Sequence, residues 1–182
     1  IPIFVRRKGQ RMSKSPAIHV LVLCTGNSAR SILGEALFNH LGKGRVRAFS
    51  AGSKPSGTVN PLALETLEKH GIPLPEEVRS KSWDEFAVPG APQIDYIFTV
   101  CASAAGETCP IWPGHPTTAH WGIADPAHVE PIEARRDAFE VAYQALEKRI
   151  KAFIALDLES MSAKDVATAA RLIHEAVGAT EQ

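Results

Sequence analysis

Two kinds of hydrophobic pattern alternate along the chain. Short, continuous apolar runs rich in β-branched residues are typical of strands that are buried on both faces of a parallel sheet. A shorter run after a proline-rich loop predicts one more short strand. The expected strands cover residues 18–23, 46–50 and 95–100, and the fourth ends near Trp121.

Between these runs, apolar residues recur every three or four positions, as they do in helices that pack on a core. This spacing covers residues 32–41, directly after the first strand, and residues 139–153. Strands therefore alternate with helices along the chain. That order predicts a single-domain α/β fold with an open, mostly parallel four-stranded sheet and helices on both faces.

Two further helices are indicated by residues typical of helix ends. Asn60 is followed by a proline, the usual order of a cap and a first helical residue, and this helix should close at Gly71. Ser162 forms a capping box with Asp165 and should begin the last helix. Gly178 is expected to stop it.

Length and charge limit the classes of protein that the chain can represent. Its 182 residues suffice for one hydrophobic core and are few for two. Basic and acidic residues number 20 each, which argues against a strongly cationic surface for nucleic acid. No apolar run approaches the roughly 20 residues of a membrane-spanning helix. We therefore expect neither nucleic acid nor membrane as a partner.

The two ends of the chain differ from its centre. The first 14 residues hold five basic residues and no acidic one, without a cleavable signal pattern, and are expected to form a disordered or appended basic lead. Residues 15–156 should form the main domain, and residues 157–182 a C-terminal helical extension of it. Three cysteines in a chain without secretory features predict reduced thiols and a cytoplasmic location.

The sequence CTGNSARS begins at Cys24, directly after the first expected strand. Gly26 and Asn27 tolerate the left-handed backbone that a tight loop needs, so the N–H groups of the loop can turn inward. With the start of the next helix they form a cradle for a tetrahedral oxyanion, to which Arg30 adds a bidentate contact. The same positive field favours a nucleophilic Cys24 thiolate, and Ser31 can donate a hydrogen bond to its sulfur. The expected oxyanion-binding residues are Thr25, Gly26, Asn27, Ser28, Ala29, Arg30 and Ser31.

This loop resembles the phosphate loop of the low-molecular-weight protein tyrosine phosphatase fold, which follows the first strand and begins with the nucleophilic cysteine. In that family a later Asp-Pro dipeptide supplies the general acid. The matching dipeptide here is Asp125-Pro126 in the segment WGIADPA. The resemblance therefore implies that Asp125 protonates the leaving oxygen after Cys24 attacks.

Two more cysteines follow the third expected strand. Cys101 ends that strand. Cys109 follows it with seven residues between them, in a segment of small residues. A phosphatase of this type needs only one nucleophilic cysteine. If Cys24 captures an oxyanion whose central atom can be reduced, a second thiol can attack the adduct and a third can carry the disulfide to the surface.

The segment FTVCASAAGETCP, with the HWG and DPA motifs that follow it, resembles the arsenate reductases built on this phosphatase fold, including the thioredoxin-coupled group. The resemblance extends from about residue 18 to about residue 156. It implies that the domain of residues 15–156 reduces arsenate to arsenite, with phosphate as a competing oxyanion. It also implies that Asn27, Ser31 and Glu35 hold the loop and its sulfur in place.

The same resemblance implies an order of reaction. Cys24 attacks arsenate bound by Arg30, Cys101 attacks Cys24 and releases arsenite, and Cys109 then attacks Cys101. A Cys101–Cys109 disulfide is left for a thioredoxin-like partner. An external thiol reductant is thus implied, with no tightly bound cofactor and no metal.

The reductant and a zinc alternative stay open at this point. The thioredoxin-coupled pattern has one residue fewer between the last two cysteines, and a further cysteine where this chain has Ala29. Reductants of the thioredoxin, glutaredoxin and mycoredoxin types are therefore all compatible with the sequence. A zinc site formed by Cys101, Cys109, His115 and His120 is disfavoured, because the spacing lacks a close CxxC or HxxxH pair.

Three functions compete for this sequence: an arsenate reductase, a tyrosine phosphatase that hydrolyses phosphomonoesters through a cysteinyl-phosphate intermediate, and a noncatalytic anion-binding module. A tyrosine phosphatase commonly carries a tyrosine just after the Asp-Pro, where this chain has Ala127. A binding module has no need for nucleophile, arginine and acid together. The additional cysteines favour the reductase.

Overall fold

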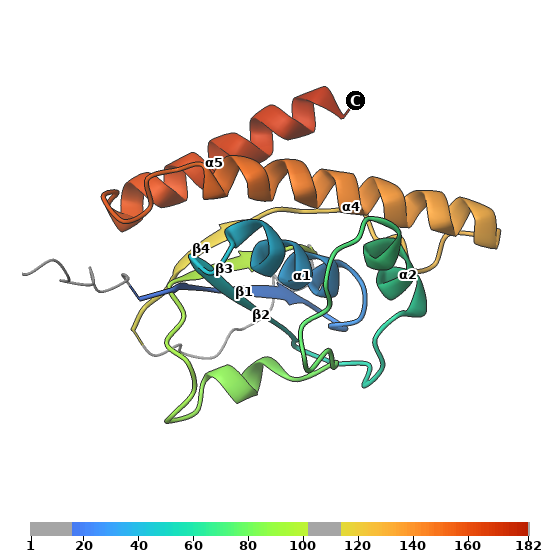
Figure 1. The fold of residues 1–182 in the computed structure, drawn as a ribbon, viewed down its shortest axis with the longest axis horizontal. Helices are drawn as coiled ribbons and strands as arrows, with labels where there is room; N and C mark the ends of the chain where they lie inside the picture. The colour runs from blue at the N-terminus through green and yellow to red at the C-terminus, as the bar shows by residue number, and fades with distance from the viewer. Residues whose placement is uncertain (1–15, 102–113, 182) are drawn as a thin grey trace, which may run out of the picture.

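The structure, a computed structural model, describes residues 16–101 and 114–181. Four strands form one parallel sheet in the order β2-β1-β3-β4 (Figure 1). This confirms the predicted open, parallel, four-stranded sheet, and each strand lies close to its expected range. The strands are β1 (Ile18–Cys24), β2 (Val46–Gly52), β3 (Tyr96–Thr99) and β4 (Thr117–His120).

The helices follow the predicted order. Asn60 caps α2, because its side chain accepts a hydrogen bond from the N–H of Leu62, and Ser162 caps α5 by accepting from the N–H of Asp165. In the described ranges, no helix is long and apolar enough to cross a membrane. The helices are α1 (Arg30–Gly42), α2 (Pro61–Lys69), the 3₁₀ helix η1 (Trp83–Phe86), α4 (Ile132–Ile154) and α5 (Ala163–Thr180).

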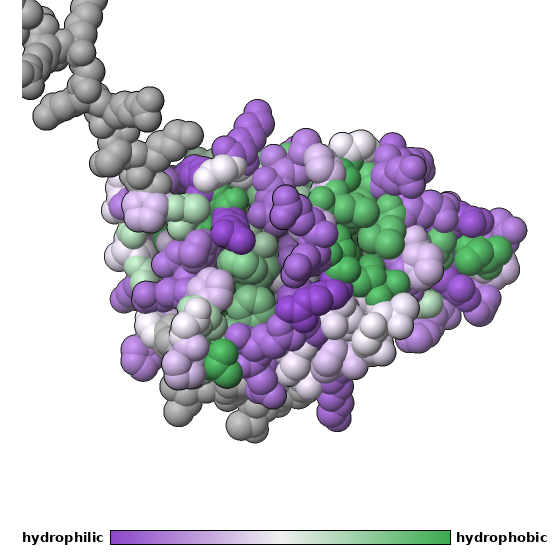
Figure 2. Space-filling view, turned by 60° about the horizontal axis from the view of Figure 1, so that its bottom comes forward, coloured by the Kyte–Doolittle hydropathy of each residue, from purple (hydrophilic) through white to green (hydrophobic). Residues whose placement is uncertain are grey.

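Both faces of the sheet are covered, but unequally. In Figure 1, α1, α4 and α5 lie on one side of the strands, and η1 lies on the other. Alternate residues of β1 divide between two apolar clusters: Val20 and Val22 face the α-helices, while Leu21 and Leu23 face η1. The continuous apolar run of β1 is thus explained by burial on both faces. Figure 2 brings the η1 side forward and shows separate hydrophobic patches among hydrophilic side chains.

The predicted stop at Gly178 is wrong, because α5 continues to Thr180. Gly178 does not adopt a left-handed backbone conformation. A Cβ atom there would lie 3.8 Å from Nη2 of Arg149, so the glycine lies where the helix passes over this guanidinium. The same arginine holds Glu181, one residue beyond the end of α5.

Arg149 on α4 is only 2% exposed and connects α4 to α5. Its guanidinium donates to both carboxylate oxygens of Glu181, at 2.7 and 3.1 Å, and to Nδ1 of His174 at 2.9 Å. A fourth hydrogen bond goes to the carbonyl of Ala145. A buried guanidinium is tolerated because all these acceptors surround it.

Arg149→Met should therefore destabilise the protein by about 2 kcal/mol, because it leaves Glu181 and His174 without their buried donor. Urea unfolding measures this difference. Arg171→Met is the matched control, since Arg171 forms an exposed ion pair with Glu175 on α5, and it should cost less than about 0.5 kcal/mol. Equal losses in the two variants would contradict the anchoring role of Arg149.

Candidate active site

The carboxyl ends of the strands bring the predicted chemical groups to one edge of the sheet. Cys24 ends β1, and Cys101 follows β3 by two residues. Strand-like pairing continues beyond β3, because the N–H of Val100 donates to the carbonyl of Leu23 and the N–H of Ile123 donates to the carbonyl of Val100, both at 2.9 Å. This pairing fixes the loop after β1 against the segments that follow β3 and β4.

The loop after β1 has its carbonyl groups turned outward. Backbone N–H groups of the segment 54–60 donate to the carbonyls of Thr25, Gly26 and Ser28, each at 2.9 Å. The C=O and N–H groups of one peptide unit point in opposite directions. The N–H groups that follow these carbonyls therefore face the interior of the loop, which is the arrangement of an anion-binding nest.

Asn27 fixes the loop from inside. It is fully buried and adopts the left-handed backbone predicted from the sequence, with φ of 44°. Its side-chain oxygen accepts from the N–H of Lys81 at 2.9 Å, and its Nδ2 donates to the hydroxyl oxygens of Ser31 and Ser50 at 2.8 and 3.0 Å. Because both ends of the amide are bound, its orientation is determined by its neighbours.

The Cys24 sulfur lies at the base of this nest. It is 3.2 Å from the backbone N of Asn27, which donates to it, and 2.9 Å from Oγ of Ser31. Helix α1 begins at Arg30, and its capping residue is Ala29, whose side chain has no acceptor. The first-turn N–H groups of α1 are therefore directed toward the loop without a side-chain cap.

Arg30 joins the loop to the predicted acid. Its Nη1 donates to the carbonyl of Ile123 at 2.8 Å, and its Nη2 lies 3.5 Å from Oδ2 of Asp125. The Arg30 side chain is 16% exposed and that of Asp125 is 43% exposed, so the pair sits at the mouth of the site. Asp125 is held by the N–H of Ala127, which donates to its Oδ1 at 2.9 Å.

Cys101 lies against Thr25, the residue that follows Cys24. Its buried sulfur accepts from the backbone N–H of Thr25 at 3.2 Å and is 3.4 Å from Oγ1 of Thr25. The structure therefore places the Cys101 sulfur in contact with the loop that begins at Cys24. Cys109, the third predicted sulfur, lies outside the described residues.

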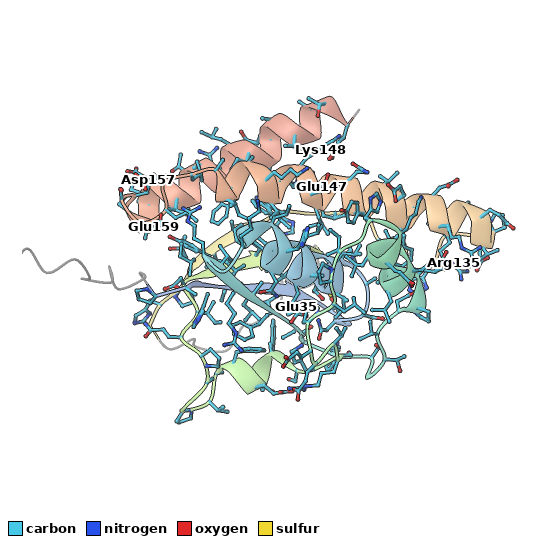
Figure 3. All side chains as sticks on the ribbon, viewed as in Figure 1. Glu35, Arg135, Glu147, Lys148, Asp157 and Glu159 are labelled. Carbon is cyan, nitrogen blue, oxygen red and sulfur yellow. The ribbon has the colours of Figure 1, made fainter. Side chains whose placement is uncertain are left out.

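A hydrogen-bond chain continues behind the loop. Ser50 on β2 accepts from Asn27 and donates to Oε2 of Glu35 at 2.7 Å. Glu35 lies on α1 where the helix meets the sheet (Figure 3), and burial raises the pKa of its carboxyl. Glu35 was predicted from the sequence, but Ser50 and Lys81 were not. Ser50 could have been found as a small polar residue within a buried strand.

Among the described residues, no cluster of three or more His, Cys, Asp or Glu side chains could hold a metal ion. His120, a member of the zinc alternative, instead places its Nδ1 2.8 Å from Oγ1 of Thr99. The Cys109 member of that alternative lies outside the part of the chain that the structure describes.

Comparison with known proteins agrees with this fold. The profile of the family described as low molecular weight phosphotyrosine protein phosphatase matches residues 19–167. The chain belongs to this family.

Several relatives carry the name of a particular enzyme. An arsenate reductase from Bacillus licheniformis is 35% identical over 136 residues, which cover 74% of this chain and 93% of the relative. An arsenate reductase from Archaeoglobus fulgidus has a similar crystal structure, with a TM-score of 0.58, 28% identity and coverage of 75% of this chain and 99% of that one. A thioredoxin-dependent arsenate reductase from Corynebacterium glutamicum has a TM-score of 0.53 at 27% identity, with coverage of 76% and 64%.

The close contact between Gly52 and the loop gives a test of the site geometry. A Cβ atom at Gly52 would clash with the carbonyl oxygen of Thr25 and lie 3.0 Å from the backbone N of Asn27. Gly52→Ala should therefore displace the loop and destabilise the protein by about 1–3 kcal/mol, with weaker phosphate binding.

Thermal unfolding with and without phosphate measures both effects of Gly52→Ala. Gly26→Ala is the control for stability, since the nearest atom to its Cβ would be 4.0 Å away. A Gly52→Ala protein as stable as the control, and stabilised by phosphate as much as the wild-type protein, would show that this contact does not position the loop.

Proposed function

We propose that this protein reduces arsenate to arsenite, using Cys24 as the nucleophile and Cys101 as the thiol that releases the product. The position of Cys101 carries the proposal. Its sulfur contacts Thr25, next to the nucleophile, at 3.2 Å. Relatives that cover most of the chain are named arsenate reductases, which supports the same reaction.

The first step uses the loop and the Arg30–Asp125 pair. The inward N–H groups and the Arg30 guanidinium bind the tetrahedral arsenate, with phosphate as a competitor. The Cys24 thiolate attacks arsenic and forms an S–As bond. One As–O bond breaks, and the leaving oxygen takes a proton from Asp125.

The second step transfers two electrons to arsenic. The Cys101 sulfur attacks the Cys24 sulfur and forms a disulfide, while the electron pair of the S–As bond passes to arsenic and reduces it from As(V) to As(III). Arsenite leaves as the product. The Thr25 N–H donates to the Cys101 sulfur at 3.2 Å and so holds the attacking sulfur beside the residue that follows Cys24.

The third step restores Cys24. Cys109 attacks the Cys101 sulfur, releases the Cys24 thiolate and leaves a Cys101–Cys109 disulfide. An external dithiol then reduces this disulfide by exchange, so the reaction needs no tightly bound cofactor. The similarity to a thioredoxin-dependent reductase supports a thioredoxin-like protein as the reductant, with glutaredoxin and mycoredoxin types as alternatives.

Hydrolysis of phosphomonoesters is the second candidate function. It is favoured by the family and by the Cys24, Arg30 and Asp125 arrangement, which suits a cysteinyl-phosphate intermediate equally well. Hydrolysis of a phosphomonoester does not require a second cysteine, so it does not account for the Cys101 sulfur beside Thr25. We therefore expect phosphatase activity to be weak and reduction to dominate.

A single-turnover assay distinguishes the two functions. Fully reduced protein mixed with arsenate, without added reductant, should release about one arsenite and lose two thiols per chain, because disulfide formation is a two-electron oxidation. Cys24→Ser and Cys101→Ser should release none. Cys109→Ser should turn over once, since Cys24 and Cys101 suffice for reduction. Steady hydrolysis of an aryl phosphate without arsenite or thiol loss would leave a phosphatase instead.

Thr25→Val tests the contact with Cys101 alone. Valine has the same shape and keeps the backbone N–H, but it removes the hydroxyl 3.4 Å from the Cys101 sulfur. One lost hydrogen bond of about 1 kcal/mol should slow arsenite release in a single turnover about five-fold. The rate of Cys24 alkylation should stay unchanged. An equal slowing of both rates would mean that Thr25 acts on the whole loop rather than on Cys101.

A further inference from the structure

Ser80 takes no part in the chemistry proposed above, but its side chain contacts the loop after β1 directly. It lies in the segment before η1 and is partly buried. Its Oγ lies 3.0 Å from the carbonyl oxygen of Gly26 and 3.1 Å from the backbone N of Gly57. One hydroxyl group thus joins three parts of the chain: the loop after β1, the segment 54–60 and the segment before η1.

Chemistry fixes the direction of both hydrogen bonds of Ser80. A carbonyl oxygen can only accept, so the Ser80 hydroxyl donates to Gly26. A backbone N–H can only donate, so the N–H of Gly57 donates to the Ser80 oxygen. Ser80 therefore uses its single hydroxyl hydrogen on the loop.

The peptide unit between Gly26 and Asn27 connects Ser80 to the Cys24 sulfur. Its carbonyl oxygen also accepts from the N–H of Ser56 at 2.9 Å, so both lone pairs of this oxygen are used. The opposite end of the same peptide unit is the N–H of Asn27, which donates to the Cys24 sulfur at 3.2 Å. The orientation of this peptide therefore decides what faces the sulfur.

The residue types on both sides of this peptide allow it to rotate unless it is held. Gly26 has no side chain and Asn27 has a φ of 44°, and both residue types tolerate unusual backbone angles. A half-turn of the planar peptide would exchange the positions of its N–H and C=O groups. The carbonyl oxygen would then face the Cys24 sulfur, where its partial negative charge opposes a thiolate and a bound oxyanion.

We propose that Ser80 is a positioning residue that holds the Gly26–Asn27 peptide with its N–H on the Cys24 sulfur and its carbonyl turned away from the bound oxyanion. The hydrogen bonds to the carbonyl also strengthen the N–H at the other end, because hydrogen bonds in a chain polarise one another. The inference rests on the proposed function, in which this loop binds the oxyanion. Its test, however, requires no arsenate.

A neighbouring serine offers a matched control. The Oγ of Ser82, two residues further along the same segment, accepts from the N–H of Asp84 at 3.2 Å and so caps η1. Within the described residues, this hydroxyl has no hydrogen bond to the loop after β1. Ser82→Ala thus removes the same atom from the same segment without releasing the Gly26 carbonyl.

Protection of Cys24 from alkylation by inorganic phosphate, in the full-length protein, tests the proposal. Iodoacetamide is the reagent, and mass spectrometry of the Cys24 peptide separates its signal from those of Cys101 and Cys109. In Ser80→Ala, the phosphate concentration for half-protection should rise about five-fold, because one hydrogen bond that holds the peptide is lost. Ser82→Ala should keep the wild-type concentration.

Ser80→Thr separates the hydroxyl group from the packing of the side chain. It keeps the donor, so its half-protection concentration should stay within about two-fold of the wild-type value. The melting temperatures of Ser80→Ala and Ser82→Ala should fall by similar amounts, since each variant loses one hydrogen bond. A change in stability alone therefore does not explain a change in phosphate affinity that is confined to Ser80→Ala.

An unchanged half-protection concentration in Ser80→Ala would overturn the proposal, and so would an equal rise in Ser82→Ala or in Ser80→Thr. Failure of phosphate to protect wild-type Cys24 would also overturn it, because the loop would then not bind the oxyanion. Absence of arsenate reduction together with the expected pattern of phosphate protection would instead contradict the proposed function and leave the role of Ser80 intact.

Discussion

The arrangement of the loop after β1 depends on the hydrogen bonds of the Asn27 side-chain amide. It accepts from the backbone N–H of Lys81 and donates to Ser31 and Ser50, so it ties the loop to α1, β2 and the segment before η1. Together with the N–H groups of segment 54–60, which bind the outward carbonyls of the loop, it holds the peptides of the loop in the arrangement described above. The anion nest is therefore prepared by the fold rather than by a ligand.

The parallel sheet supplies the rest of the geometry. Because all four strands run in one direction, their carboxyl ends place the Cys24 sulfur, the Cys101 sulfur and the Asp125 segment at a single edge. The Arg30 guanidinium reaches from the first residue of α1 to the carbonyl of Ile123, so the helix start and the acid segment are held together. A site formed by three separate chain segments thus has the rigidity of the sheet.

The sequence predicts those parts of the structure that depend on local patterns. The apolar run of β1, the left-handed backbone of Asn27 and the caps of α2 and α5 each depend on neighbours within a few residues, whereas Gly26, for which the same backbone was expected, does not adopt it. The contact of Lys81 with the loop could not be predicted, because its backbone N–H donates to Asn27, which is more than 40 residues away in the sequence. The wrong stop at Gly178 has the same origin, because the Arg149 guanidinium, which binds Glu181 just beyond α5, belongs to a different helix.

The claim that Cys24 and Cys101 react with each other as a pair is tested most directly by mapping disulfides in Cys109→Ser after one turnover with arsenate. The account predicts a protein that is two hydrogens lighter, in which the peptides of Cys24 and Cys101 are linked. If arsenite is released while Cys24 and Cys101 both stay reduced, or while Cys24 is linked to another group, the account is contradicted.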